Sequence, residues 1–237
     1  ALTLTEVGEA VGISRAAADV GLDVGSGFTV ETDGLLPDGT TLDAAIEAMV
    51  ANEWRSVTVE KLCAAAGLNK RYFYESFAGL DEVGAAVVDD IADEVRASTM
   101  AALTQAGRDD VAGQAAAVVD ALVRTLVADP RRARVLLGGV TSSPVLHQHR
   151  SAVMVGLTGV LMAHARTIHD VELERDPLAQ VAPAFLIGGT ADAILAFVDG
   201  RAKVSVDDLI SSLTALWLIT GNGAAEVARL RLGEELS

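Results

Sequence analysis

Lys70, Arg71 and Tyr72 are three successive residues whose side chains can donate hydrogen bonds to a partner. An arginine guanidinium can hold guanine by two parallel hydrogen bonds, and a tyrosine can contact a thymine methyl group or a phosphate. Three such residues in isolation are more often a solvated basic turn of a surface helix. Their interpretation therefore depends on the elements that carry them.

The sequence contains no glycine-rich phosphate loop, nucleophile elbow or metal-binding pair. His147 and His149 are two residues apart and point to different sides of a helix, whereas two ligands on one face are spaced by three or four. Cys63 is the only cysteine, so no disulfide framework can form, and buried packing is favoured over redox sensing. We expect no enzymatic activity, no bound metal and no cofactor.

Short helical patterns surround the three donor residues. An apolar stripe predicts a first helix over 42–52. Thr58 is typical of the N-cap of a second helix, which Gly67 ends because glycine adopts a left-handed conformation without steric cost. Asn69 caps a third helix that continues through Phe77. Two short helices around a glycine-centred turn form a helix-turn-helix, whose second helix enters the major groove of DNA.

The segment from Thr58 to Phe77 resembles the TetR family of transcriptional regulators. The similarity is clearest in Ala66-Gly67-Leu68-Asn69-Lys70 and in Tyr74 with Phe77 three positions on, and Trp54 stands in the family's usual aromatic slot. The resemblance implies that Phe73 and Phe77 pack the small core. It also implies a set of DNA-binding residues, in which Thr58 and Tyr74 contact phosphates and the first turn of the third helix faces bases: Thr58, Lys70, Arg71, Tyr72 and Tyr74.

Charge argues that any DNA contact is local. The formal net charge is -15, and duplex DNA attracts a protein only where Lys and Arg are concentrated. Between residues 40 and 80, four basic residues stand against five acidic ones, a net of −1. Leu80 replaces a lysine common in the family, and Glu75 adds a negative charge near the DNA face. A TetR-fold ligand-binding or interaction protein that has lost specific DNA binding is therefore the alternative.

Residues 81–237 contain longer helical patterns, and no segment alternates long enough to build a sheet. We predict an all-α protein with an acidic, glycine-rich leader (1–39), a three-helix helix-turn-helix DNA-binding domain (40–80) and a helical ligand-binding and dimerisation domain (81–237). The leader also resembles a degenerate MerR-type segment. The predicted helices of the last domain cover about 81–105, 110–128, 130–139, 144–169, 177–199 and 206–231.

In the TetR family the last two helices of each chain form a four-helix dimer interface. The resemblance therefore implies a homodimer through 177–199 and 206–220, with double-stranded DNA as the partner and a palindromic operator. Small residues would let these helices approach closely, namely Gly188, Gly189, Ala191 and Ala193. Apolar contacts would come from Leu209, Leu213, Leu216 and Trp217.

Five of the nine aromatic residues lie in the DNA-binding segment, so an aromatic-walled drug pocket in the helical body is not expected. Aliphatic walls including Met154 and Met162 would suit an aliphatic or acyl effector, while His164 and Asp192 are either polar pocket groups or satisfied core residues. For each aliphatic residue, packing in the core has the higher prior, whereas the two interpretations of His164 and Asp192 are equally favoured. The apolar run 181–198 contains Pro183 and Asp192 and indicates a buried helix rather than a membrane span. We expect a cytoplasmic protein without a membrane partner.

Overall fold

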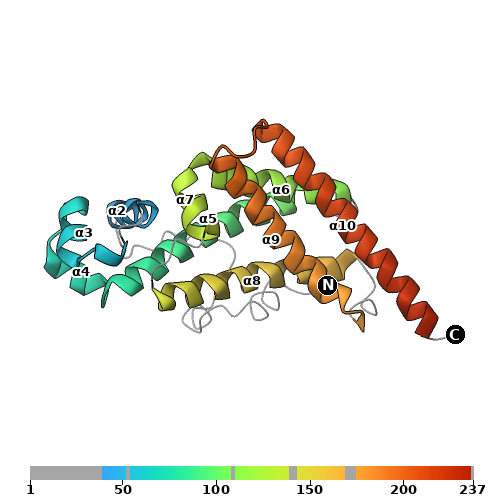
Figure 1. Ribbon diagram of the computed structural model, residues 1–237, viewed down its shortest axis with the longest axis horizontal. Coiled ribbons are helices and arrows are strands. Elements are labelled where there is room, and N and C mark those ends of the chain that lie inside the picture. Colours follow the sequence, from blue (N-terminus) through green and yellow to red (C-terminus); the bar gives the residue numbers. More distant parts are fainter. Residues whose placement is uncertain (1–38, 52–53, 108–109, 139–142, 169–174, 236–237) are drawn as a thin grey trace, which may run out of the picture.

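A computed structural model describes residues 39–51, 54–107, 110–138, 143–168 and 175–235, and every long element in this part of the chain is a helix (Figure 1). The prediction of an all-α protein is confirmed. The predicted leader lies, except for its last residue, outside the described residues. The helices are α2 (Gly39–Val50), η1 (Trp54–Ser56), α3 (Val59–Ala66), α4 (Lys70–Ser76), α5 (Leu80–Gln105), α6 (Val111–Ala128), α7 (Pro130–Gly138), α8 (Pro144–Ile168), α9 (Leu178–Val198) and α10 (Val206–Glu235).

Local hydrogen bonds explain where α3 and α4 begin and end. Thr58 Oγ1 accepts a hydrogen bond from the Lys61 amide at 3.3 Å, which is the N-cap expected of a threonine. Gly67 ends α3 with a φ of 69°, a left-handed conformation that glycine adopts without steric cost. Asn69 Oδ1 then accepts from the Arg71 amide at 3.0 Å. These three caps produce the predicted helix-turn-helix.

The small N-terminal domain is closed by one apolar cluster. Trp54 is 6% exposed and Phe73 is 2% exposed, so both aromatic residues pack inside, as was predicted for Phe73. Cys63 is 4% exposed, which confirms that this cysteine is a core residue. This burial raises the pKa of its thiol. The same cluster continues into the first turns of α5, because Val83 and Val87 are fully buried against it. The two domains therefore share a continuous core.

Helix α5, 26 residues long, connects the small domain at one end of the molecule to the helical body (Figure 1). It packs against α6, α7 and α8 as well as α2. Gly84 lies where α2, α5 and α8 meet. A Cβ atom there would be 2.6 Å from Cδ2 of Leu146 and 3.1 Å from Cε of Met49. The absence of a side chain at residue 84 allows these three helices to approach closely.

Helices α9 and α10 pack against each other in the helical body, and α10 lies at the end of the molecule away from the small domain (Figure 1). The indole Nε1 of Trp217 donates to Oγ1 of Thr190 at 2.8 Å, and Thr190 is 4% exposed. Arg231, near the end of α10, forms an ion pair of 3.2 Å with the buried Asp176 before α9. These contacts fix α10 along α9 from its middle to its last turns.

By length and composition alone, two helices in the described chain could cross a membrane, over Val111–Ala128 and Val181–Val198. Both pack laterally against several helices of the same body, and 22% and 28% of their residues are buried. Helix α9 nevertheless leaves large apolar side chains exposed, namely Val181 and Phe185.

Candidate nucleic-acid interface

Helix α4 separates its aromatic residues between two faces. Phe73 and Phe77 are buried, whereas Tyr72 and Tyr74 are 62% and 58% exposed. The ring of Phe73 meets that of Tyr74 edge to face, with centroids 5.3 Å apart. The inward phenylalanines thus fix α4 on the small core while both tyrosines project outward. The structure places Tyr72 and Tyr74 on the outside of the helix-turn-helix, as a DNA-reading helix requires.

Each cation of α4 has an acidic partner within the same domain. Lys70 Nζ pairs with Oε1 of Glu60 on α3, and Arg71 Nε pairs with Oε1 of Glu75 at 2.9 Å, one turn along α4. The hydrogen bond from Lys70 holds the pKa of Glu60 below its ordinary value. All four side chains are substantially exposed, so water and salt weaken the pairs. The cations can therefore exchange these carboxylates for another anion.

Two further cations, for which no role was predicted from the sequence, lie beside the N-terminus of α3. Arg55 is exposed on η1, one turn before the N-cap Thr58. Lys61 is exposed in the first turn of α3, and its Nζ donates to the Ser56 carbonyl at 3.2 Å. A helix N-terminus attracts anions, and the flanking basic residues reinforce that field. Their spacing around a capping threonine was the available sequence signal.

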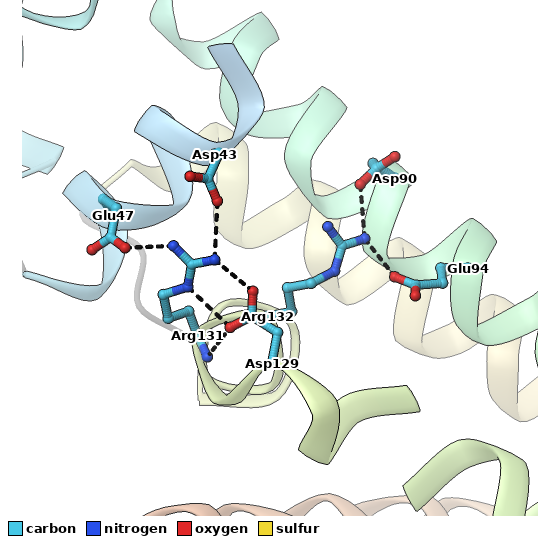
Figure 2. Close-up of polar contacts among 7 residues, drawn as sticks. All are labelled: Asp43, Glu47, Asp90, Glu94, Asp129, Arg131 and Arg132. Atoms are coloured by element: carbon cyan, nitrogen blue, oxygen red, sulfur yellow. Dashed lines mark hydrogen bonds and ion pairs between the residues drawn. The ribbon is translucent and has the colours of Figure 1, made fainter. Parts of the chain in front are cut away.

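The acidic residues of α2 contact the helical body. Arg131, at the start of α7, pairs through Nη2 with Oδ1 of Asp43 at 3.0 Å and through Nη1 with Glu47 (Figure 2). It also contacts Asp129 at 2.7 Å, and these hydrogen bonds hold the pKa of Asp129 below its usual range. Two of the five acids in the sequence count thus share one arginine outside the domain, which also pairs with Asp129. A single positive charge faces three carboxylates, so it offsets only part of the negative charge of α2.

Helix α7 carries two more arginines that connect it to other elements. Arg132 Nη2 lies 2.8 Å from Asp90 and 2.7 Å from Glu94, both on α5 (Figure 2). Arg134 pairs with Asp199 at the end of α9 at 3.0 Å. The short helix therefore links the small domain, the long α5 helix and the α9 end of the body through charged contacts.

The residues predicted to bind an effector are not gathered around one described cavity. Met154 is half-buried on α8, Asp192 is exposed on α9, and the side chains of Met162 and His164 lie outside the described residues. An open groove of about 490 Å³ lies between α6 and α10, and none of the four lines it. Within the described ranges, no three His, Cys, Asp or Glu side chains meet as metal ligands.

A small helix-turn-helix domain followed by a larger helical body is the architecture of the TetR-family transcriptional regulators. No protein-family model and no curated protein sequence matches this chain. Solved structures do match.

The fatty acid degradation regulator FadR from Bacillus halodurans has a TM-score of 0.63 and 18% identity over 76% of this chain and 97% of its own. FadR from Bacillus subtilis in complex with stearoyl-CoA has a TM-score of 0.61 and 18% identity over 76% and 96%. A protein from Shewanella sp. PV-4, described as a TetR-family transcription regulator, has a TM-score of 0.57 and 17% identity over 76% and 94%. The chain has the TetR-family fold.

Proposed function

We propose that the protein is a dimeric, ligand-responsive transcriptional repressor that binds a palindromic operator. The observation that carries the proposal is α4, which follows a correctly capped turn and presents Lys70, Arg71, Tyr72 and Tyr74 on its exposed side. No catalytic role is proposed for any residue. Such a regulator acts in the cytoplasm, where the chromosome of a bacterium is accessible to it.

In the proposed complex, the first turn of α4 enters the major groove. Arg71 offers a planar fork for guanine, and Lys70 and Tyr72 reach neighbouring base edges or phosphates. Tyr74 and the N-terminus of α3 at Thr58 contact the phosphate backbone, as the resemblance to the TetR family implies. Few cations are involved, so a single domain binds weakly. Specific binding therefore depends on two domains acting together.

An exposed apolar stripe on α9 supports a dimer. Val181 and Phe185 are 60% and 66% exposed, and Gly188, Gly189 and Asp192 continue the same face at helical spacing. No neighbouring atom lies within 4 Å of a Cβ built on either glycine, so a second helix can approach closely there. Large apolar side chains this exposed on a long helix are typical of an interface.

Helix α10 adds a second stripe beside the first. Leu216, Ile219 and Leu230 are 54%, 68% and 63% exposed. Leu209 and Leu213, which the sequence assigned to the dimer contact, are 6% and 3% exposed within the core of a single chain. They stabilise the body instead. The proposed four-helix interface therefore uses the outer face of α10, which includes the predicted Leu216 and leaves out Leu209 and Leu213.

The dimer has a direct test in sedimentation at micromolar concentration. Phe185→Asp on α9 should shift the protein toward monomer, because it puts a charge in the centre of the proposed interface. Val155→Asp is the matched control, since Val155 on α8 is 70% exposed and lies outside that interface. Dissociation by both variants, or by neither, contradicts the interface.

For the effector we propose a small aliphatic or acyl compound bound in the body near α8, the helix that carries Met154, Met162 and His164; Asp192 is exposed on the proposed dimer face of α9 and is not part of this site. Support comes from the aliphatic composition of the body and from the stearoyl-CoA bound to FadR of Bacillus subtilis. The effector changes DNA affinity only to the extent that it prefers one conformation of the dimer. Titration of an operator complex with stearoyl-CoA and with free coenzyme A would separate acyl recognition from nucleotide binding.

The test of DNA binding is selection of bound sequences from random duplexes, followed by binding assays across a salt series. Wild type should enrich a palindrome, and the double variant Lys70→Ala with Arg71→Ala should not. Equally poor binding by both proteins at low salt contradicts the proposal. That result favours the second candidate, a TetR-fold ligand-binding or interaction protein, for which the pairing of both α4 cations with Glu60 and Glu75 is the supporting observation.

A further inference from the structure

Glu75 and Arg71 form an ion pair on the exposed side of α4, one helical turn apart. Oε1 of Glu75 accepts from Nε of Arg71 at 2.9 Å, while the Arg71 side chain remains 81% exposed. Among the residues that the structure describes, none accepts a hydrogen bond from the two terminal nitrogens of this guanidinium. The carboxylate thus holds one part of the fork and leaves Nη1 and Nη2 open.

The order of the two residues determines how the fork is presented. Side chains of an α-helix tilt toward its N-terminus, so Arg71 extends toward the first turn of α4 and Glu75 extends back toward Arg71. We infer that Glu75 is a positioning residue that sets the base preference of Arg71, by holding the guanidinium with its terminal nitrogens available to the edge of a guanine. This inference rests on the proposed function, because it requires α4 to enter the major groove.

The physical reason is competition between bases and phosphates for the same arginine. An unrestrained arginine on a long flexible chain binds any nearby phosphate, and that contact carries no sequence information. The hydrogen bond from Nε to Glu75 restricts the Arg71 side chain, so fewer of its orientations reach a phosphate. It leaves the two terminal nitrogens as the pair of donors that matches N7 and O6 of guanine. The carboxylate also repels DNA of every sequence. Glu75 should therefore lower general affinity and raise discrimination.

Glu60 provides a matched comparison in the same domain. It pairs with Lys70, whose ammonium group is a point charge with no fork to orient. Glu60→Gln and Glu75→Gln each remove one exposed negative charge that pairs with a cation of α4, and each keeps a side chain of similar size. A purely electrostatic role predicts the same outcome for both. A positioning role predicts a change in base preference only for Glu75→Gln.

The experiment uses the full chain and measures base preference after selection, together with affinity for random duplex. Arg71→Ala first identifies the base pair that Arg71 reads. At that pair, wild type should prefer guanine to adenine by roughly 5- to 150-fold, the range of one bidentate contact. Glu75→Gln should reduce this preference by at least about threefold and tighten binding to random duplex by about two- to tenfold at low salt.

Glu60→Gln should tighten random binding to a similar degree and leave that base preference unchanged. Arg71→Lys keeps the charge without the fork, so it should lose the preference while Glu75 is still present. If Glu75→Gln retains the full guanine preference, the inference is overturned while the proposed function stands. If wild type enriches no palindrome, both are overturned.

Discussion

Replacing Arg131 with methionine tests whether α7 fixes the small domain on the body. Arg131 is 32% exposed on its side chain and contacts Asp129, Asp43 and Glu47, and the last two belong to α2 (Figure 2). Methionine keeps much of the apolar stem and removes only the guanidinium. The variant therefore isolates the charged contacts from packing.

The expected loss follows from how exposed each partner is. The contact with Asp129, which is 27% exposed, involves two charge-assisted hydrogen bonds and should contribute about 1.5 kcal/mol. Asp43 and Glu47 are 58% and 61% exposed, so water screens them and together they add about 0.5 kcal/mol. The total of about 2 kcal/mol corresponds to a melting temperature lower by about 4 to 8 °C for a chain of this size.

Thermal unfolding at fixed protein concentration measures the loss, since a dimer makes the midpoint depend on concentration. Arg201→Met is the control: Arg201 is 64% exposed and lies 3.7 Å from Asp199, so its removal should change stability by less than about 0.5 kcal/mol. Hydrogen exchange should accelerate in α2 of the Arg131 variant and remain unchanged in α9. Equal melting temperatures for the two variants would refute the calculation.

The pH dependence supplies a second check on the same contact. Arg131 lowers the pKa of Asp129 in the folded state, so this contribution is present above the unfolded value of about 4. It is lost as the pH falls through the lower folded value. The difference between wild type and Arg131→Met should therefore narrow below about pH 4. A difference that stays constant from pH 7 to about pH 3 would assign the effect to packing instead.

Three further predictions concern the interior of the molecule. Gly84→Ala should destabilise the protein by about 1 to 2 kcal/mol, because the added methyl group crowds the junction of α2, α5 and α8. Gly159→Ala has open space around it and should instead stabilise the protein by about 0.5 to 1 kcal/mol. Chemical denaturation measures both changes. Thr190→Val should cost about 1 to 3 kcal/mol and shift tryptophan fluorescence, because it leaves the indole N–H of Trp217 without its acceptor. Cys63 should react with a thiol reagent only as fast as the small domain opens, and a fast reaction in native buffer would contradict its burial.

Local chemistry explains which parts of the fold were predictable from the sequence. Thr58 and Asn69 accept hydrogen bonds from amides within three residues, and Gly67 adopts a left-handed conformation, so their identity alone placed both ends of α3 and the start of α4. The aromatic residues of α4 were equally clear, since Phe73 and Phe77 recur at helical spacing and both are buried. These features need no knowledge of what lies across the core.

Contacts between distant segments were not predictable in the same way. Arg131 and Asp43 are 88 residues apart in sequence, and nothing in either local pattern indicates the partner. In α10, Leu213 faces the core and Leu216 faces outward, although both are leucines on an apolar helix. The spacing of apolar residues shows which residues share a face of such a helix. It does not show which of two apolar faces packs against the rest of the chain.

The ion pairs also change how the acidic character of the chain bears on DNA binding. A net charge of -15 weakens every sequence-independent contact with phosphates, so nonspecific affinity is low. The two acids of α2 share Arg131 of the body, and Glu60 and Glu75 near α4 each hold one cation that can be released. Under the proposed function, such a protein would gain little from random DNA and would depend on base contacts made twice by a dimer. Because specificity is the ratio of specific to nonspecific affinity, weak phosphate binding favours discrimination among sites rather than opposing it.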